Sequence, residues 1–250
     1  MTGLDPIFLG SRDLDRSAEF YTGLLGFPAV PVPPRPRAEL PVRAFRAGDV
    51  LIHVTEVGPA GEPGDWVNDD LQGGIRHFGM KIGDVDAQIG RLRAAGVPVL
   101  SPPADVLGGV RIAFFLDPDG ARLEFVQGNL VYQHIYAREG ADAEAATRLA
   151  AQDGPRFDHV AITVPDRAAA LRYWCDGQGF EVIGEIRHHD DPRGFLMTYL
   201  RAGPAVLEVF SFDVPTSPDP LPAEPGELLG FRGFGIDGAR FDGARFDGAQ

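Results

Sequence analysis

Cysteine, basic residues and long apolar runs are all scarce in this sequence. Cys175 is the only cysteine among 250 residues, so no intrachain disulfide can form and a metal site must use other side chains. Lysine and arginine number 23 against 36 aspartates and glutamates, and the resulting charge of −13 repels nucleic acid. No run approaches the roughly 18 apolar residues of a membrane span, and no basic and apolar leader follows Met1. These absences predict a cytoplasmic protein without a nucleic-acid or membrane partner.

What the sequence has instead is internal repetition. Three times, an apolar strand pattern stops at an aspartate suited to cap a helix: Asp13, Asp84 and Asp166. Each expected helix ends near a glycine suited to a left-handed cap: Gly26, Gly96 and Gly179. Three further strand-like runs follow each cap, and in the second unit the last two are separated by a chain reversal at 117–120. Each unit thus reads strand, helix, strand, strand, strand, and a lone sheet of this kind needs a partner to cover it.

A fourth copy begins near the C-terminus and is incomplete. Residues 230–236 repeat the pattern of 74–80, but a five-residue repetition without a helix pattern follows them. Proline, aspartate, glutamate and serine are frequent just before this copy, as is typical of a linker. We therefore expect paired modules at 1–130, a third module at 155–214, a linker at 215–229, and a truncated module with its tail at 230–250.

These strand and helix signatures resemble the vicinal-oxygen-chelate superfamily of glyoxalases, extradiol dioxygenases and drug-binding resistance proteins, over nearly the whole chain. The resemblance implies an α+β fold in which tandem βαβββ modules pair into curved mixed sheets. It also implies that metal ligands come from the first and last strands of two paired units. The first-strand positions, seven residues before each capping aspartate, are Pro6, His77 and His159, with Gly233 in the remnant. The last-strand positions, 47, 47 and 49 residues further on, are His53, Glu124 and Glu208.

Imidazole nitrogen and carboxylate oxygen are the donors that a divalent metal such as Zn, Fe, Ni or Mn binds at neutral pH. The candidate metal ligands are therefore His53, His77, Glu124, His159 and Glu208. These residues could instead be polar or ion-paired sheet residues, but a glutamate inside an apolar strand is costly unless it is paired or ligating. The remaining histidines carry less weight: His188 and His189 are interpreted as part of a solvated hairpin, and His134 as structural.

Which units pair decides which ligands meet. If the first and second units pair, as consecutive units usually do in this family, His53, His77 and Glu124 converge and Pro6 adds nothing. If the second and third pair, the set resembles the four-ligand arrangement of glyoxalase-like enzymes: His77, Glu124, His159 and Glu208. The first pairing is favoured, because the connector 55–74 has a length suited to joining neighbours. The third unit would then be covered by the remnant or by a second chain in a homodimer.

The resemblance implies that the metal holds two neighbouring oxygens of a small-molecule substrate. The first expectation is a glyoxalase-like lyase or isomerase in which Glu124 or Glu208 moves a proton. The second is an extradiol-type dioxygenase with iron held by His53, His77 and Glu124, although extradiol enzymes draw both histidines from first strands. The third is a metal-free binding or resistance protein, because two of the ligand positions carry proline and glycine.

Overall fold

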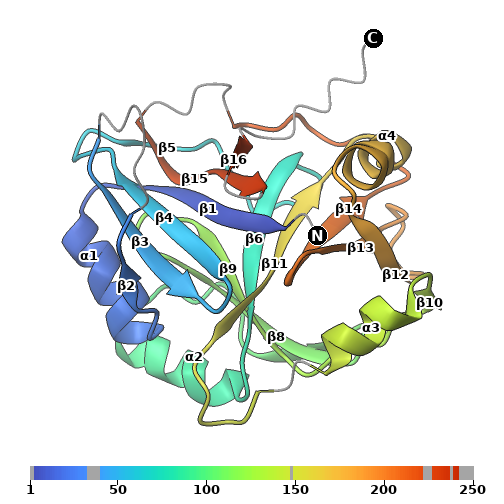
Figure 1. Cartoon of the computed structure of the whole chain (residues 1–250), viewed down its shortest axis with the longest axis horizontal. Helices are drawn as coiled ribbons and strands as arrows, with labels where there is room; N and C mark the ends of the chain where they lie inside the picture. The colour runs from blue at the N-terminus through green and yellow to red at the C-terminus, as the bar shows by residue number, and fades with distance from the viewer. Residues whose placement is uncertain (1–2, 33–39, 147–148, 222–226, 237–238, 242–250) are drawn as a thin grey trace.

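Two curved mixed β-sheets make up most of the computed structural model, which describes residues 3–32, 40–146, 149–221, 227–236 and 239–241. The helices lie around the outside of the sheets (Figure 1). The fold is therefore α+β, as predicted from the sequence.

The first sheet joins the first unit to the C-terminal remnant, in the order β16-β15-β1-β4-β3-β2. Its strands are β1 (Leu4–Ser11), β2 (Ala29–Val30), β3 (Val42–Ala47), β4 (Val50–Glu56), β15 (Leu228–Ile236) and β16 (Ala239–Phe241), with β5 (Glu62–Pro63) beside β15. The first strand of the unit, β1, runs antiparallel to β15 and parallel to β4. Strand β15 begins inside the predicted linker, and residues 222–226 of that linker and 242–250 of the tail lie outside the described residues.

The second sheet joins the second unit to the third, in the order β10-β12-β13-β14-β11-β6-β9-β8-β7. Its strands are β6 (Gly74–Lys81), β7 (Ala104–Val106), β8 (Val110–Leu116), β9 (Arg122–Gln127), β10 (His134–Ile135), β11 (Arg156–Thr163), β12 (Glu181–Arg187), β13 (Leu196–Ala202) and β14 (Ala205–Ser211). The two first strands, β6 and β11, pair antiparallel along the middle of the sheet.

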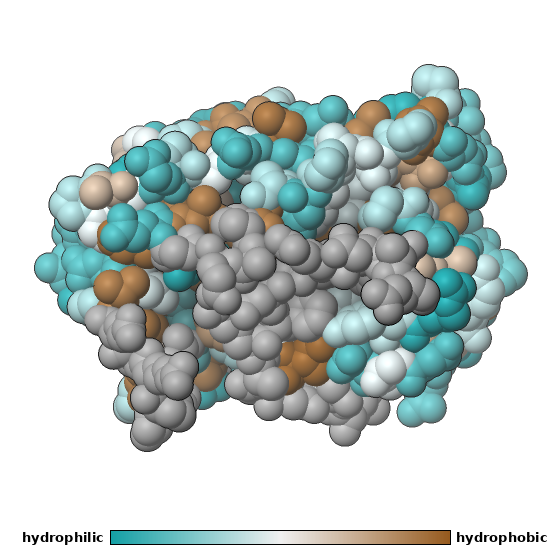
Figure 2. All heavy atoms as spheres, turned by 90° about the horizontal axis from the view of Figure 1, so that it is seen from above, coloured by the Kyte–Doolittle hydropathy of each residue, from teal (hydrophilic) through white to brown (hydrophobic). Residues whose placement is uncertain are grey.

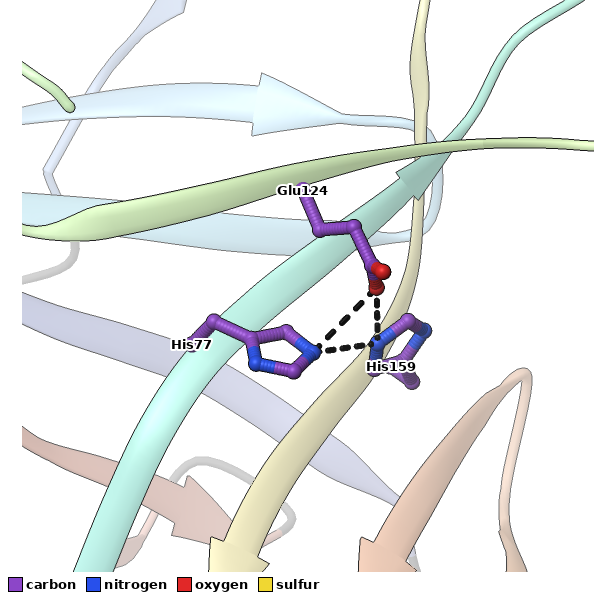
Figure 3. Close-up of side chains that lie close together, drawn as sticks. All are labelled: His77, Glu124 and His159. Carbon is purple, nitrogen blue, oxygen red and sulfur yellow. Dashed lines mark hydrogen bonds and ion pairs between the residues drawn. The ribbon is translucent and has the colours of Figure 1, made fainter. Parts of the chain in front are cut away.

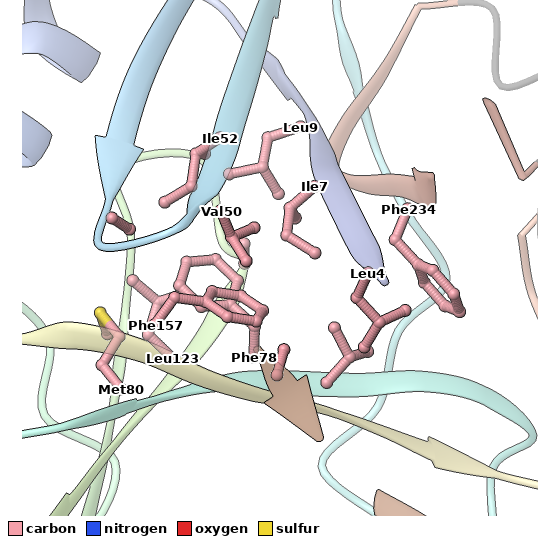
Figure 4. Packing of buried hydrophobic residues seen from close by; sticks show 14 of the residues in the cluster. Leu4, Ile7, Leu9, Val50, Ile52, Phe78, Met80, Leu123, Phe157 and Phe234 are labelled. Carbon is pink, nitrogen blue, oxygen red and sulfur yellow. The ribbon is translucent and has the colours of Figure 1, made fainter. Parts of the chain in front are cut away.

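The expectation that the first and second units share a sheet is wrong. The edge of β6 that a neighbouring unit could occupy is taken by β11 of the third unit. The first and second units meet instead through apolar faces in one core, where Leu9 and Ile52 lie on one side and Phe78 and Met80 on the other (Figure 4). Burial of apolar area, which has no direction, joins these units, whereas backbone hydrogen bonds join the second unit to the third.

The three helix starts agree with the sequence. The side chains of Asp13, Asp84 and Asp166 each accept a hydrogen bond from a backbone N–H in the first turn that follows. The helices are α1 (Leu14–Ala18) with the π-helical turn η1 (Glu19–Leu24), α2 (Val85–Ala94), α3 (Arg138–Ala145), and α4 (Arg167–Leu171) with the π-helical turn η2 (Arg172–Gly177). The predicted cap glycines all have positive φ, at 78° for Gly26, 79° for Gly96 and 75° for Gly179.

A one-residue β-bulge stands immediately before His77, His159 and Gly233, and another lies at or beside Pro6. In the pairing of β6 with β11, Arg76 has no opposite residue on β11 and Asp158 has none on β6. In the pairing of β1 with β15, the extra residue is Arg232 on β15 and falls within 5–6 on β1. A bulge bends the strand and re-aims nearby side chains, which is why bulges are frequent beside functional sites. The remnant therefore keeps the strand register of a complete unit.

The surface seen from above is mostly hydrophilic, with separate apolar patches among the described residues (Figure 2). Charged residues make up 24% of the sequence, which is about the usual share for a globular protein. Within the described ranges, no helix is both long enough and apolar enough to cross a membrane.

A buried hydrogen bond ties the first unit to the second. The Tyr21 hydroxyl donates to Asp117 Oδ2 at 2.9 Å, and both side chains are buried. Asp117 opens the predicted chain reversal, where Gly120 has a φ of 94°, and its Oδ1 accepts from the backbone N–H groups of Asp119 and Ala121. Burial raises the pKa of Asp117 to about 6, while the bond from Tyr21 acts to lower it.

The change Tyr21→Phe should destabilise the fold by about 1.5–3 kcal/mol, the range for a hydrogen bond to a charged group. The raised pKa of Asp117 means that the folded state favours its protonated carboxyl, so the stability gained by protonating Asp117 is present below about pH 4 and is lost as the pH rises through about 6. The bond from Tyr21 acts the other way, because it favours the ionised carboxylate. Phenylalanine removes a donor that the ionised carboxylate uses, and the loss should be larger at pH 8 than at pH 4.5. Urea unfolding at both pH values measures it. The exposed Tyr136, bonded to Glu185, is the control: Tyr136→Phe should change stability by less than about 0.5 kcal/mol.

Candidate metal centre

Three buried side chains converge on one point from three adjacent strands (Figure 3). His77 comes from β6, His159 from β11 and Glu124 from β9. The Nε2 atoms of the two histidines are 3.1 Å apart, and Glu124 Oε2 is 3.2 Å from that of His77 and 3.0 Å from that of His159. Residues far apart in the sequence thus place three donor atoms within contact of one another.

Strand alternation explains why these side chains face the same way. Along β6, Phe78 and Met80 turn into the core, and His77 and Lys81 turn to the opposite face, where they line a cavity. Register brings the last strand into place, because Glu124 on β9 lies opposite Gly79, two residues after His77. The third unit repeats this register with Glu208 on β14 opposite Ala161, two residues after His159.

Gly79 makes room for the imidazole of His159. A Cβ atom at position 79 would lie 2.0 Å from His159 Cε1 and 2.4 Å from its Nε2, so no other residue leaves the ring where it is. Gly79 was not among the predicted site residues, although a glycine inside a strand is a recognised sign that another group approaches closely.

Glu208 is the fourth side chain of the cluster, beside His77, His159 and Glu124. Its Oε2 lies 3.7 Å from His77 Nε2 and 3.6 Å from His159 Nε2, farther than Glu124. The buried Tyr199 on β13 lies opposite Glu208 in the pairing of β13 with β14, and its presence acts to lower the pKa of Glu208. Four of the five predicted ligands therefore meet in the second sheet.

His53 is the exception, because it lies in β4 of the other sheet. There it faces Phe8 on β1, with ring centroids 5.8 Å apart in an edge-to-face arrangement. The predicted register is nevertheless present, since Phe8 lies opposite both His53 and Gly233. The set of His53, His77 and Glu124 expected for an extradiol site is therefore not brought together by this fold.

The bulge at Asp158 gives His159 a second partner. Asp158 and His159 both line the cavity although they are consecutive, because Asp158 is the extra residue of the bulge. Asp158 Oδ2 lies 3.0 Å from His159 Nδ1, which leaves Nε2 of that ring toward Glu124. His77 Nδ1 is buried and has no hydrogen-bond partner among the described residues.

Burial and mutual charge set the pKa values of the cluster. Burial lowers the pKa of His77 to about 4, against the effect of Glu124. Burial acts in the same direction on His159, but its bonds to Asp158 and Glu124 outweigh burial and raise its pKa. Burial also acts to raise the pKa of Glu124, yet the two imidazoles lower it to about 2. Burial raises the pKa of Glu208 to about 7. The cluster thus joins an ionised carboxylate to a carboxyl group that can hold a proton near neutral pH.

The donor set fits a divalent metal ion. Metal bonds to imidazole nitrogen and carboxylate oxygen are about 2.0–2.2 Å long, which places neighbouring ligand atoms about 3.0–3.5 Å apart at octahedral to tetrahedral angles. The three contacts among His77, Glu124 and His159 measure 3.0 to 3.2 Å. Two imidazoles and a carboxylate also form a donor set that suits zinc and non-haem iron.

The cluster lines a cavity of about 190 Å³, and sequence reasoning missed several other residues of its wall. His188, predicted to lie in a solvated hairpin, faces this cavity, and Arg122 on β9 does so as well. Glu144 on the connector helix α3 also reaches the wall and accepts a hydrogen bond from Tyr132. No spacing rule in the sequence links these positions to the repeated ligand register. They reach the cavity through the curvature of the sheet and the path of a connector.

Comparison with known proteins gives matches over most of the chain. The model of the Glyoxalase/Bleomycin resistance protein/Dioxygenase superfamily matches residues 3–125 and 156–245. A protein named "Probable lactoylglutathione lyase" from Synechocystis sp. is 28% identical over 122 residues, which cover 46% of this chain and 87% of that protein. Another of the same name, from Vibrio cholerae, is 30% identical over 122 residues, which cover 46% of this chain and 83% of that protein.

The fold is also similar to that of a solved enzyme. The crystal structure of glyoxalase I from Zea mays aligns with a TM-score of 0.61 at 20% identity, over 86% of this chain and 69% of that one. At this identity the likeness concerns the fold alone. The family match, by contrast, covers both segments that carry the repeated units. The chain therefore belongs to the Glyoxalase/Bleomycin resistance protein/Dioxygenase superfamily.

Proposed function

We propose that this protein is a metal-dependent, glyoxalase-like lyase or isomerase that acts on a small substrate with two neighbouring oxygens. The observation that supports it is the convergence of His77, Glu124 and His159 within 3.0 to 3.2 Å, with Glu208 beside them. The names of the two curated relatives point in the same direction. A metal-free binding protein would have no need to keep two glutamates and two histidines buried together, at the cost of removing their charges from water.

In this proposal His77, His159 and Glu124 hold the metal, and Glu208 moves a proton. When bound, a divalent ion would stabilise negative charge on two substrate oxygens. A carbon next to these oxygens would then be easier to deprotonate. Glu208 lies farther from the two imidazoles than Glu124 does, and it is therefore the carboxyl that can leave the cluster to reach a substrate carbon. Tyr199, opposite Glu208 on the neighbouring strand, is the buried polar side chain beside it.

An extradiol-type dioxygenase is the second candidate, now with a different ligand set. His77 and His159 both come from first strands, and with Glu124 they form a set of two histidines and one carboxylate. Glu208 favours the first candidate, because a dioxygenase needs open positions for substrate and oxygen. Lyase or isomerase turnover of a small substrate with two neighbouring oxygens by protein loaded with Zn, Ni or Mn would support the first candidate, whereas oxygen uptake with a catechol by iron-loaded protein would support the second candidate instead.

Alanine at either histidine should remove the metal. Loss of an outer hydrogen-bond partner lowers metal affinity by about 10–100-fold, and loss of a ligand should cost more. We expect His77→Ala and His159→Ala to purify without bound metal, and His53→Ala, the matched control from the other sheet, to retain it. Elemental analysis of protein purified without chelator measures this, with thermal melting as the check on folding. Full metal content in a folded His77→Ala protein, or loss in His53→Ala alone, would contradict the proposal.

A methyl group at position 79 should weaken the metal site without removing any ligand. In Gly79→Ala the new Cβ would overlap the His159 ring, which must turn or shift. We expect at least a 10-fold lower metal affinity, comparable with the loss of an outer-shell contact. Competition with a chromogenic chelator gives the affinity. The control is Gly90→Ala on helix α2, where a Cβ meets nothing within 4 Å and the affinity should be unchanged.

The change Glu208→Gln should separate proton transfer from metal binding. Because glutamine keeps the shape of the side chain but cannot move a proton, turnover should fall by about 10²–10⁴-fold. The metal should stay bound, since His77, His159 and Glu124 are unchanged. Elemental analysis and turnover are measured on the same preparation. Unchanged turnover in metal-loaded Glu208→Gln protein would assign the proton transfer to another group.

A further inference from the structure

Besides His77 Nδ1 in the metal cluster, two buried nitrogen atoms of cavity-wall residues have no hydrogen-bond partner among the described residues. They are Arg122 Nε and His188 Nε2, and neither makes a hydrogen bond to any residue that the structure describes. Buried polar groups in folded proteins are nearly always hydrogen-bonded, because desolvating one without a partner costs free energy. Two such atoms on the wall of one cavity therefore point to a ligand that supplies the missing acceptors.

Arg122 is a nearly buried cation that no carboxylate of the described chain holds by a hydrogen bond. Its side chain is 11% exposed, and its closest acid is Asp70, with 3.8 Å between Nη1 and Oδ1. The guanidinium is fixed instead by stacking, since its Cζ lies 3.8 Å from the centroid of the Phe114 ring. Stacking leaves the edge of the guanidinium, where its N–H groups lie, free to bind an acceptor.

His188 faces the same cavity from the turn between β12 and β13. Its ring stacks on Phe195 with centroids 4.7 Å apart, and its backbone N–H donates to the carbonyl of the same residue. These two contacts hold the imidazole in place while Nε2 remains without a partner. Asp70 also lines this cavity and lies 3.8 Å from Arg122, so we take the end of the cavity that Asp70 lines as the end that Arg122 and His188 share.

The metal centre lies within reach of this end. Arg122 and Glu124 are two residues apart on β9, a separation of about 7 Å along a strand, and share one face of the sheet. Phe114 contacts both Arg122 and the metal cluster. Arg122 stacks on its ring, and the ring lies 5.2 Å from the ring of His77. Most of the remaining wall is apolar, with Val110, Ile112, Met197, Val206 and Phe210 among its residues. A ligand of a few bonds can therefore contact both points.

We propose that Arg122 and His188 form a subsite for a carboxylate group of the substrate, whose two reacting oxygens lie at the metal centre. This inference rests on the proposed function and adds the substrate class, a small carboxylic acid with an apolar body. A planar carboxylate matches the forked donors of a guanidinium. A monoanion is also preferred to a doubly charged phosphate, because Asp70, Glu124 and Glu208 line the same cavity and repel added negative charge.

A matched pair of ligands tests the subsite directly. Phenylacetate and phenylacetamide have nearly the same shape and differ in charge, and calorimetric titration gives the affinity of each for the holoprotein. We expect phenylacetate to bind about 10-fold more tightly or better, as a charge-assisted hydrogen bond requires. Arg122→Gln should remove this preference by weakening phenylacetate about 10-fold while changing phenylacetamide less than about twofold. The preference should also fall in His188→Gln and stay in Arg111→Gln, which removes an exposed cation paired with Asp86 and Asp105.

Two further measurements separate this subsite from the metal centre. A carboxylate could instead bind the metal, so the titrations are repeated on His77→Ala and on chelator-treated wild type. Phenylacetate preference that survives there and disappears in folded Arg122→Gln or Arg122→Lys protein supports the subsite, even if the metal analysis contradicts the proposed enzyme. Preference that disappears without metal and survives in Arg122→Gln, or equal affinity for the two ligands in the wild type, overturns the inference.

Discussion

The antiparallel pairing of β6 with β11 is the contact on which the rest of the site depends. Its register places Ala161 opposite His77 and Gly79 opposite His159, so the two imidazoles cross toward each other from neighbouring strands. The parallel partners β9 and β14 then add one glutamate each from the outer sides of the pair. A slip of one residue would turn both histidines into the core and Phe78 into the cavity, because successive side chains alternate between faces. The bulges before each histidine fix this register locally.

Local features of this arrangement could be predicted from the sequence, and the pairing could not. The capping aspartates, the cap glycines and the spacing between first and last strands all depend on short stretches of chain, and each prediction agrees with the structure at residues such as Asp84 and Gly96. The partner of β6 depends on which of several similar strand edges it meets, and nothing within 74–81 distinguishes them. A connector of suitable length also permits more than one destination, so 55–74 could cross the core as readily as follow an edge.

The two sheets have the same strand register, but only the second carries the cluster of histidines and glutamates. In the second sheet a small residue, Gly79, faces a large one, His159, and the imidazole occupies the space that the glycine leaves. In the first sheet the order is reversed, since the large Phe8 faces Gly233 and lies against His53. In the first sheet the Phe8 ring thus occupies the register position that Gly79 leaves open in the second sheet. The same backbone register therefore does not by itself create a candidate metal site. The side chains at the first-strand and last-strand positions of the two units determine whether one forms.

The shared core makes the first sheet indispensable to the second. Every proposed ligand lies between Gly74 and Ser211, and a fragment with these limits would seem to contain the whole centre. The rear of its central strands, however, consists of Phe78, Met80 and Phe157, which β1 and β4 now cover. Cutting the chain at Gly74 would expose this apolar face, and exposed apolar faces of that kind favour self-association. The first sheet, which carries none of the four clustered residues, thus keeps this apolar face from contact with other copies of the chain.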